Sequence, residues 1–372
     1  MEIFKIVIAA FAVIGALDYA FGSRLGIGKE FVSGIMLLGT MVLTMVGMIV
    51  LAPGLATLLS PLFDFTADVL HLDPSIIPAI FFANDMGGAP LAAEIMRDGK
   101  IGLFNALVTS SMMGATVSFT IPFALGVVPK EKHRPLLLGL LCGIVTIPIG
   151  CFVGGLVAGI SVLPLLYNLL PLILFAAIIA VGLVRAPGAC VKIFSFIGKL
   201  ITVAIIVGLS LGIIRFLTGF ELIKGLGTVE EGMDVCVNAA MFLAGAFPLV
   251  YVLTRFLRRP LRAFGRVFGI NETSSVGLLA TLASSAPTYG IMKDMDERGA
   301  MLNAAFAVSG AWVVAGHLAF TIAFPGGEAY VLPMMLGKLS AALLALLLAA
   351  LLSGRVLAAK KTETPEENTA TE

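Results

Sequence analysis

Charged residues are scarce in this chain, and their scarcity excludes most classes of soluble protein. Only 13% of its 372 residues are Asp, Glu, Lys or Arg, against about 25% in an average soluble domain. The formal net charge is +1, so the chain has no basic field with which to hold a nucleic acid. With 59% hydrophobic residues and a mean hydropathy of +1.05, it is neither a soluble globular enzyme nor a disordered chain.

Cysteine is also rare, and its placement predicts neither a disulfide framework nor a metal site. Cys142, Cys151, Cys190 and Cys236 are scattered among apolar residues without a CxxC pair, so we interpret them as small core residues. The His, Cys, Asp and Glu residues lack ligand spacing, which predicts no metal and no cofactor. Glycine (41) and proline (18) are abundant. In so apolar a sequence, this combination indicates an all-α polytopic membrane protein with interrupted helices.

Long hydrophobic stretches predict nine membrane-spanning helices, because a helix needs about 20 apolar residues to cross a bilayer. The first stretch contains Asp18, lacks a small-x-small cleavage site and continues into more apolar sequence. It is therefore not interpreted as a cleavable signal peptide. The polar end at 359–372 predicts a short disordered tail. The predicted spans are 3–22, 33–52, 101–127, 135–160, 163–184, 194–217, 233–254, 300–323 and 332–354.

Two further apolar regions break in the middle and predict re-entrant hairpins. Residues 73–98 break at 84–90 (NDMGGAP), and residues 271–294 break at 284–287 (SSAP). Gly-Gly and Pro leave backbone N–H and C=O groups unpaired, and at membrane depth protein or a water-filled cavity must satisfy them. A hairpin that dips in and returns provides this, and the alternative is a single kinked span. The central position of both breaks favours the hairpins.

The two halves of the chain repeat each other. Residues 95–98 (IMRD) match 291–294 (IMKD), an Ala-Pro pair precedes each and an Asn-Ala pair follows each, with the offset between 196 and 199 throughout. Ordered matches around two broken segments indicate an internal repeat. The predicted organisation is therefore a first repeat at 1–134, two linking transmembrane helices at 135–184 and a second repeat at 185–358.

The distribution of charge predicts that the repeats are inverted. The segment at 255–266 (RFLRRPLRAFGR) carries five arginines, whereas its counterpart at 59–72 has Asp64 and Asp68 and neither Lys nor Arg. Cytoplasmic loops are enriched in Lys and Arg, so corresponding points of the two halves lie on opposite faces. This places the amino terminus outside and the carboxyl terminus in the cytoplasm. Inverted repeats with broken helices are typical of secondary transporters and channels.

The hairpin tips of such a fold meet near the midplane, so their side chains predict the substrate. Asp85 lies in the first tip, where an ionisable residue is costly and functional by default. We predict that it is the counter-ion of a cation, and the alternative is that it caps the returning half-helix. Asn84 beside it is a second candidate. Glu94 on the returning limb either lines the site or pairs with Arg97 one turn away.

The second tip and the spans after both hairpins add hydrogen-bonding and aromatic groups. Ser284 and Ser285 suit a hydroxyl or an amine, although serine also packs helices closely in membranes. Trp312, the only tryptophan, either faces an ammonium ion through a cation–π contact or packs against lipid and core. His317 could titrate, but a core histidine whose ring nitrogens are already hydrogen-bonded is the commoner case. The remaining candidates for substrate binding are Tyr289, Asn105, Asn303 and Thr109.

FFANDMGGAPLAAEIMRDGK (81–100) and the segment at 270–312 resemble the EutH family, membrane proteins of bacterial ethanolamine-utilisation operons, and the resemblance covers essentially the whole chain. It implies that the chain carries ethanolamine across the inner membrane. Carriage is most useful at acidic pH, where the protonated amine cannot diffuse through lipid. The resemblance also implies a functional link to a cytoplasmic cobalamin-dependent ethanolamine lyase.

A more distant likeness is to concentrative nucleoside transporters, in the segments at 87–107 and 274–287. It implies an elevator-like or gated arrangement in a homo-oligomer. Asp85 stands only close to the place where that superfamily has a glutamate, so no sodium site is carried over. Two other functions stay open, ion-coupled symport of another polar solute such as a nucleoside and a non-transporting membrane scaffold for metabolic enzymes. The chain has no room for a folded soluble domain, so no enzymatic activity is predicted.

Overall fold

The computed structural model describes the backbone of residues 2–358, and it describes no side chain at 2–4, 191, 253–254, 257–267 or 355–358. The predicted tail at 359–372 therefore lies outside the described residues. So do the side chains of four of the five arginines in the segment at 255–266, which are Arg258, Arg259, Arg262 and Arg266.

The described chain is predominantly helical and contains no strand. Within it, seven continuous helical stretches are long and apolar enough to cross a bilayer. The predicted span at 3–22, which forms α1 (Glu2–Ala20), is not among them, nor is the predicted span at 300–323. The seven stretches are Ile27–Leu58, Gly99–Val127, Lys130–Val157, Val162–Arg185, Pro187–Thr218, Val229–Val252 and Gly327–Gly354.

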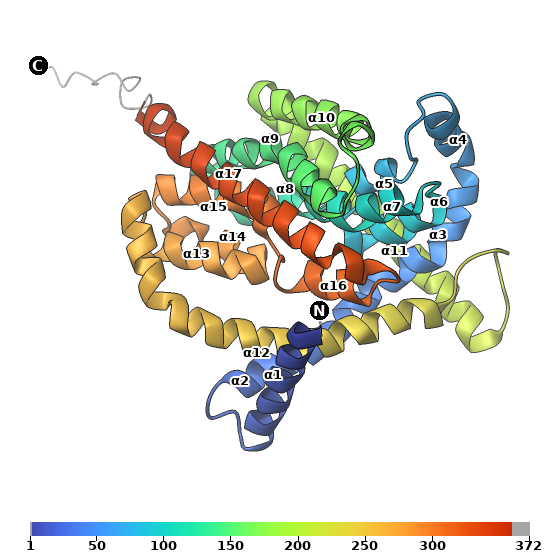
Figure 1. The fold of residues 1–372 in the computed structure, drawn as a ribbon, viewed down its shortest axis with the longest axis horizontal. Coiled ribbons are helices and arrows are strands. Elements are labelled where there is room, and N and C mark those ends of the chain that lie inside the picture. Colours follow the sequence, from blue (N-terminus) through green and yellow to red (C-terminus); the bar gives the residue numbers. More distant parts are fainter. Residues whose placement is uncertain (1, 359–372) are drawn as a thin grey trace, which may run out of the picture.

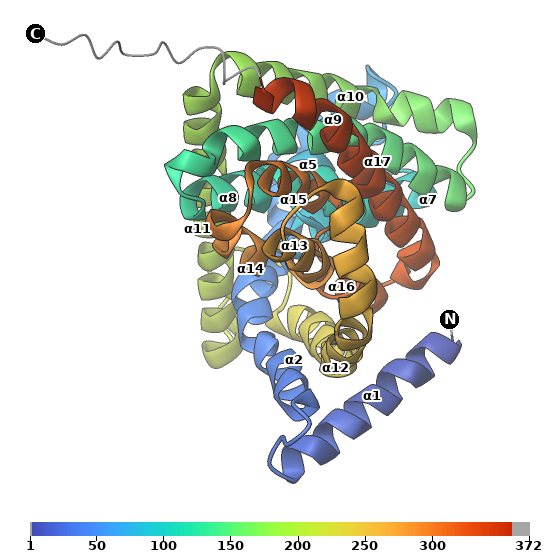
Figure 2. The same ribbon diagram turned by 90° about the vertical axis from the view of Figure 1, so that its left-hand side faces the viewer.

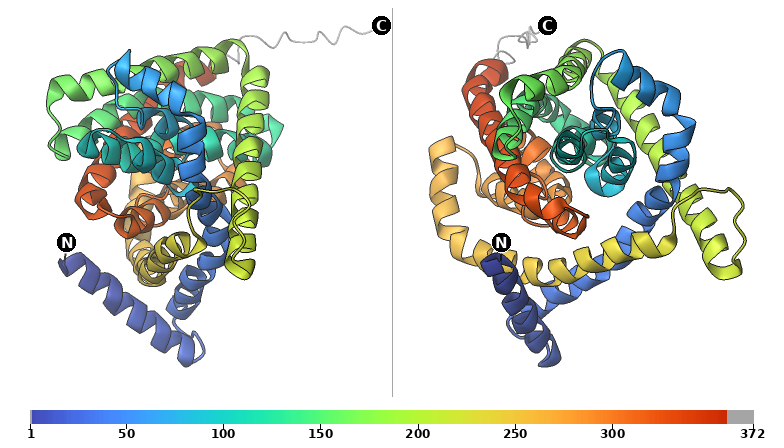
Figure 3. Two further views of the ribbon diagram at one scale, coloured as in Figure 1. Left: turned by 90° about the vertical axis from the view of Figure 1, so that its right-hand side faces the viewer. Right: turned by 45° about the vertical axis from the view of Figure 1, so that its right-hand side comes forward.

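One group of long helices runs along the outside of the others (Figure 3, right). In this group α12 contacts both α1 and α2, and α11 contacts α3. Figure 1 shows α12 passing below the helices outside this group and then bending upward, while Figure 2 shows α1 and α2 projecting away from the rest. The members are α1, α2 (Ile27–Met41), η1 (Val42–Val46), α3 (Gly47–Leu58), α4 (Ser60–Asp68), α11 (Pro187–Thr218) and α12 (Val229–Phe268).

The inner body is centred on α9 (His133–Val157), which packs against α10 (Val162–Arg185), α15 (Glu297–Gly310) and α17 (Val331–Ala358). Its core consists mainly of buried aliphatic side chains. Beside α9 runs the stretch Gly99–Val127, which is divided into α7 (Gly99–Phe104), η3 (Asn105–Gly114), η4 (Thr116–Thr120) and α8 (Ile121–Val127). The middle of this stretch is π-helical, a wide-turn geometry that is common at functional sites.

The first broken segment consists of α5 (Ile76–Phe81), η2 (Asn84–Met86) and α6 (Gly88–Ile95). Phe82 and Ala83 interrupt the helix with extended backbone, and the chain then returns so that α6 packs against α5. The carboxylate of Asp73 accepts the backbone N–H groups of Arg97 at 2.9 Å and Asp98 at 2.8 Å. The two ends of the segment are therefore held together.

The second broken segment has the same plan. It consists of α13 (Glu272–Ala283), α14 (Ser285–Gly290) and η6 (Met292–Asp294), and the interruption is at Ser284, whose backbone is extended. The backbone N–H of Asn271 donates to Asp296, and its side-chain amide donates to the carbonyl of Asp294, both at 3.0 Å. These bonds again bring the two ends of the segment together.

A third break divides the predicted span at 300–323 into α15 and α16 (Gly316–Ala323). Trp312 lies in this break with a φ of 57°, a left-handed conformation that is unusual for a residue with a side chain. The N–H groups of Trp312 and Val314 donate to the carbonyls of Thr281 and Leu282, both at 3.2 Å. Two of the backbone N–H groups that the break exposes are thus hydrogen-bonded to the end of α13, as backbone at membrane depth requires. After α16, the turn η7 (Gly327–Tyr330) leads into α17.

Candidate functional site

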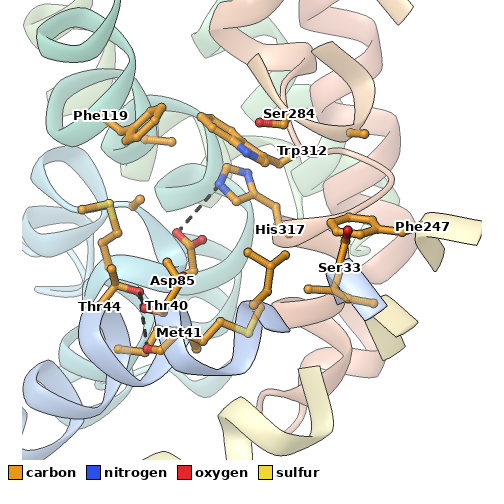
Figure 4. A pocket seen from close by; sticks show the side chains of 18 residues that line it. Ser33, Thr40, Met41, Thr44, Asp85, Phe119, Phe247, Ser284, Trp312 and His317 are labelled. Atoms are coloured by element: carbon orange, nitrogen blue, oxygen red, sulfur yellow. Dashed lines mark hydrogen bonds and ion pairs between the residues drawn. The ribbon is translucent and has the colours of Figure 1, made fainter. Parts of the chain in front are cut away.

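A cavity of about 440 Å³ lies where the two interruptions, the break before α16 and the helix pair α2–η1 meet (Figure 4). Most of its wall is apolar, and methionine and phenylalanine side chains are prominent in it. Asp85 is the only carboxylate among the described residues that line it. The lining residues with polar side chains are Ser33, Thr40, Thr44, Asp85, Ser284, Trp312 and His317.

Asp85 is placed by a tightly held tip. The next turn requires Gly87, whose φ is +102° and at which a Cβ would lie 2.0 Å from the side chain of Met48. The hydroxyl of Ser110 donates to the carbonyl of Phe82 at 2.7 Å, and the hydroxyl of Ser118 accepts the N–H of Ala83 at 3.2 Å. The π-helical segments η3 and η4 therefore hold the interruption, and the Asp85 side chain reaches the cavity with 32% of its surface exposed.

His317 lies beside Asp85 and connects it to a buried lysine. The imidazole Nε2 is 3.9 Å from Asp85 Oδ1, as the dashed line in Figure 4 marks, and Nδ1 is 3.1 Å from Lys338 Nζ. Lys338 has no exposed surface, does not line the cavity, and donates to the carbonyl of Ser111 at 2.6 Å. The three titratable side chains form a row that runs from the cavity into the protein.

Aromatic rings cover one side of this row. The indole of Trp312 packs edge-on against Phe119, with ring centroids 5.0 Å apart, and lies 5.1 Å from the imidazole of His317. Trp312 and Phe119 both line the cavity with Asp85 (Figure 4). A cation bound at Asp85 would therefore have an aromatic wall in addition to a carboxylate.

A second cavity, of about 840 Å³, adjoins the first. The two share Phe247, Ala283 and Ser284 in their walls. The second cavity also has charged residues in its lining, which are Glu30, Arg255 and Glu272. Ser284, at the interruption of the second broken segment, therefore stands between a wider, charged cavity and the narrower one that holds Asp85.

Of the ten residues predicted from the sequence to bind substrate, three line the Asp85 cavity, namely Asp85, Ser284 and Trp312. Three others are fully buried close by in the sequence and have side-chain polar atoms without a hydrogen-bond partner in the described structure. They are Asn84, Ser285 and Tyr289, and none of them lines either cavity. These unpaired groups are unusual, because buried polar atoms are nearly always hydrogen-bonded.

The remaining four predicted residues lie away from the cavity. The amide of Asn105 donates to Ser75 at 2.9 Å and to Asn168 at 3.0 Å, and Thr109 donates to Asn105 at 3.4 Å. Asn303 donates to the carbonyls of Ser274 and Gly299, both at 2.9 Å. The contacts with Ser75, Asn168 and Ser274 connect separate helical segments, whereas those of Thr109 with Asn105 and of Asn303 with Gly299 lie within one element.

Glu94, the fourth, is exposed. Its suggested partner Arg97 donates instead to Asp64 at 2.7 Å and to Asp68 at 2.5 Å. This arginine therefore ties the end of the first broken segment to α4.

Lys338 was not predicted, although the sequence contains a signal for it. It is the only charged residue in the 23-residue run from Val331 to Ser353, and an ionisable residue at membrane depth is functional by default. Its partner His317 lies on another helix, so the pairing follows only from the fold. Within the described residues, no three His, Cys, Asp or Glu side chains gather to hold a metal, and the four cysteines are buried and free.

Comparison with known proteins identifies relatives over nearly the full length. The family model described as "Ethanolamine utilisation protein, EutH" matches residues 1–352. The "Probable ethanolamine permease EutH" of Listeria monocytogenes is 42% identical over 366 residues, which cover 98% of this chain and 97% of that protein. The protein of the same name from Escherichia coli is 39% identical over 84% of this chain and 82% of its own length. The "Uncharacterized protein YxeR" of Bacillus subtilis is 39% identical over 90% of each. No solved structure matches.

Proposed function

The chain belongs to the EutH family of ethanolamine utilisation proteins, and we propose that it is a membrane transporter that moves ethanolammonium, the protonated form of ethanolamine, into the cytoplasm. The observation that carries this proposal is the Asp85 carboxylate, which is partly exposed in a cavity whose wall is mostly apolar. Taking an ammonium ion out of water costs many kcal/mol unless an opposite charge compensates. A charge-assisted hydrogen bond to Asp85 contributes about 1.5–3 kcal/mol toward that cost.

The other polar groups of the cavity suit the rest of this substrate. The Ser284 hydroxyl accepts the N–H of Ala286 at 3.4 Å, and its own hydrogen can donate to the substrate oxygen. Thr44 donates to the carbonyl of Thr40 at 3.0 Å, so its oxygen can accept the substrate hydroxyl. The Trp312 indole adds a cation–π contact of about 0.5–2 kcal/mol. Ethanolamine occupies only part of 440 Å³, so we expect water to enter with it.

The second cavity supports a route to this site. It contains Arg255, on the side predicted to be cytoplasmic, and it reaches Ser284 at the wall that the two cavities share. We therefore propose that substrate leaves the Asp85 cavity past Ser284 and the carboxylates Glu30 and Glu272. Movement of the second interruption would open or close this route.

We propose further that the two broken segments are re-entrant hairpins in an inverted-topology repeat. Corresponding contacts support this proposal. Asn105 binds Ser75, and Asn303 binds Ser274, so the same pair of polar positions joins helix to hairpin in each half. Asp98 caps α7, and Asp296 caps α15. By this criterion Asp98 corresponds to Asp296, whereas the sequence alone pairs Asp98 with Asp294.

The proposed setting is the bacterial inner membrane, with the amino terminus outside and the carboxyl terminus in the cytoplasm. A homo-oligomer that works in an elevator-like manner, and delivery of substrate to a cytoplasmic ethanolamine lyase, belong to the same proposal. Nucleoside symport and a scaffolding role are not favoured, because three relatives are named as probable ethanolamine permeases.

Uptake of radiolabelled ethanolamine into proteoliposomes tests the function. We expect saturable uptake in protein-containing vesicles that unlabelled ethanolamine suppresses and that an excess of uridine does not. Suppression by uridine would indicate the nucleoside alternative. Absence of uptake above protein-free vesicles, with monodisperse protein in the membrane, would contradict the proposed function.

A further inference from the structure

The buried ammonium of Lys338 and the substrate ammonium need the same carboxylate. Lys338 has no exposed surface, and the titratable side chains that face it among the described residues are His317 on α16, Asp85 on η2 and Cys151 on α9. The segment η3, which supplies the Ser111 carbonyl, has no titratable side chain, and α15 has its only charged residues in the first turn. A buried thiol stays neutral, so among the described side chains Asp85 is the only negative charge near Lys338.

Charge balance follows from this arrangement. With Asp85 ionised, Lys338 protonated and His317 neutral, the row has no net charge. Binding of ethanolammonium to Asp85 would leave one uncompensated positive charge in a buried site, which is strongly unfavourable. The charge is balanced again if Lys338 loses one proton. Lysine can do so at a buried position, whereas arginine cannot.

His317 supplies the path for that proton. Lys338 Nζ is 3.1 Å from Nδ1. A protonated lysine has only donors, so with Lys338 charged Nδ1 is the acceptor and the ring hydrogen is on Nε2. Nε2 faces Asp85 and the cavity. When Nε2–H gives its proton to cavity water, Nδ1 takes a proton from Lys338. One proton enters the water, Lys338 becomes a neutral amine, and His317 remains neutral as the other tautomer.

We propose that Lys338 is the coupling residue of the transporter and that each ethanolammonium bound at Asp85 releases one proton from Lys338 through His317. This proposal rests on the proposed function and adds its energetics. When substrate leaves, a proton returns along the same path, so one proton moves outward for each ethanolammonium carried inward. Transport is then electroneutral, and it does not depend on the membrane potential.

Equilibrium binding to the purified full-length protein in detergent tests the proposal. Ethanolamine hydrochloride is titrated between pH 6 and 8, where an aliphatic amine remains protonated, and proton release is followed in weakly buffered solution. For the wild type we expect about one proton released per ethanolamine bound, and an affinity that falls about tenfold for each unit that the pH is lowered.

Two substitutions at Lys338 distinguish the effect of its positive charge from the effect of its ability to lose a proton. Lys338→Met removes the competing cation, so we expect binding at pH 7 to tighten tenfold or more, with no proton release and no pH dependence from pH 6 to 8. Lys338→Arg keeps a charge that cannot be lost, so we expect binding to weaken tenfold or more at every pH, again without proton release. A residue that only stabilised the fold would weaken binding in both variants.

The outcomes distinguish this inference from the proposed function. If the wild type does not bind ethanolamine, or if binding is indifferent to Asp85→Asn, the proposed function is wrong. If the wild type binds ethanolamine through Asp85 but releases no proton, or if Lys338→Met keeps the pH dependence, only the coupling is wrong. The wild-type proton release decides the matter by itself if either Lys338 variant fails to fold.

Discussion

The backbone N–H of Trp312 donates to the carbonyl oxygen of Thr281 at 3.2 Å, and this bond joins the break before α16 to the last turn of α13. The carbonyls at the end of a helix lack partners within it. Here the N–H groups of the break before α16 are the partners of two such carbonyls at the end of α13. Trp312, His317 and Ser284 therefore belong to one unit, whereas η3 and η4 hold Asp85 in another. Displacement of one unit against the other would change the distance between Asp85 and His317.

Asp85→Asn should weaken ethanolamine binding about tenfold or more, since 1.4 kcal/mol corresponds to a factor of ten and the amide keeps the size of the side chain without its charge. Asp98→Asn is the matched control. Asp98 is exposed and caps α7, and asparagine caps a helix equally well, so its variant should bind like the wild type. Saturation of uptake gives both affinities. Normal binding in Asp85→Asn with a loss in Asp98→Asn would move the cation site to the membrane surface.

At saturating ethanolamine, the protein should give its largest advantage over protein-free vesicles at acidic pH. Only the neutral amine crosses lipid, and below the pKa of the amine its fraction falls about tenfold for each pH unit. The saturated carrier holds the cation, so its flux does not fall in the same way. Initial rates from pH 5 to 8, with and without protein, measure the ratio. A ratio that decreases toward acidic pH would mean that the neutral amine is carried.

Part of this site could be predicted from the sequence, because residue type and the neighbouring residues alone identify some positions. An acid in an apolar tip identifies Asp85, and SSAP identifies the interruption at Ser284. No proline indicates the break at Trp312 in the sequence. The N–H groups of the break donate to carbonyls of α13, which is distant in the sequence. Residue type also does not distinguish Asn105, which joins helices, from a substrate ligand. That distinction depends on which neighbours the fold supplies.

The row of Asp85, His317 and Lys338 could not be predicted for a related reason. Each residue is on a different element, and the distances within the row depend on how α16 and α17 pack against the first broken segment. A lone histidine in an apolar segment is most often a satisfied core residue. Only the fold places a lysine on one ring nitrogen and a carboxylate near the other.

Single cysteines at Val69 and Arg255 should be labelled from opposite sides of the membrane, because the charge asymmetry predicts 59–72 outside and 255–266 in the cytoplasm. Both side chains are exposed. The four native cysteines, all buried, are replaced by alanine in this background. An impermeant maleimide applied to intact cells should label Val69→Cys, and Arg255→Cys should require permeabilised cells. Labelling of both from one side would contradict the inverted repeat.

Gly114→Ala should disturb the Asp85 tip. A Cβ at Gly114 would lie 1.8 Å from the carbonyl oxygen of Phe82, so backbone would have to move. We expect a lower thermal unfolding temperature and weaker ethanolamine binding. Gly126→Ala, in the same continuous helical stretch, is the control, because a Cβ there meets nothing within 4 Å and alanine favours a helix by about 0.5–1 kcal/mol. Equal behaviour of the two variants would show that the approach of η3 to Phe82 does not position the tip.

His317→Gln should slow transport without changing the equilibrium stoichiometry of proton release. Glutamine keeps an amide that can donate and accept near Lys338 and Asp85, but it cannot exchange one proton for another as imidazole does. The free energies of the bound and free states are then little changed, whereas the barrier between them rises. We expect a maximal uptake rate that is reduced tenfold or more, with binding affinity within about threefold of the wild type. Uptake in proteoliposomes and titration in detergent measure the two quantities on the same preparation.

Two other outcomes would contradict this role of His317. A variant with an unchanged uptake rate would mean that the proton reaches Lys338 by another path. A variant with equal losses of rate and affinity would give His317 a role in substrate binding instead.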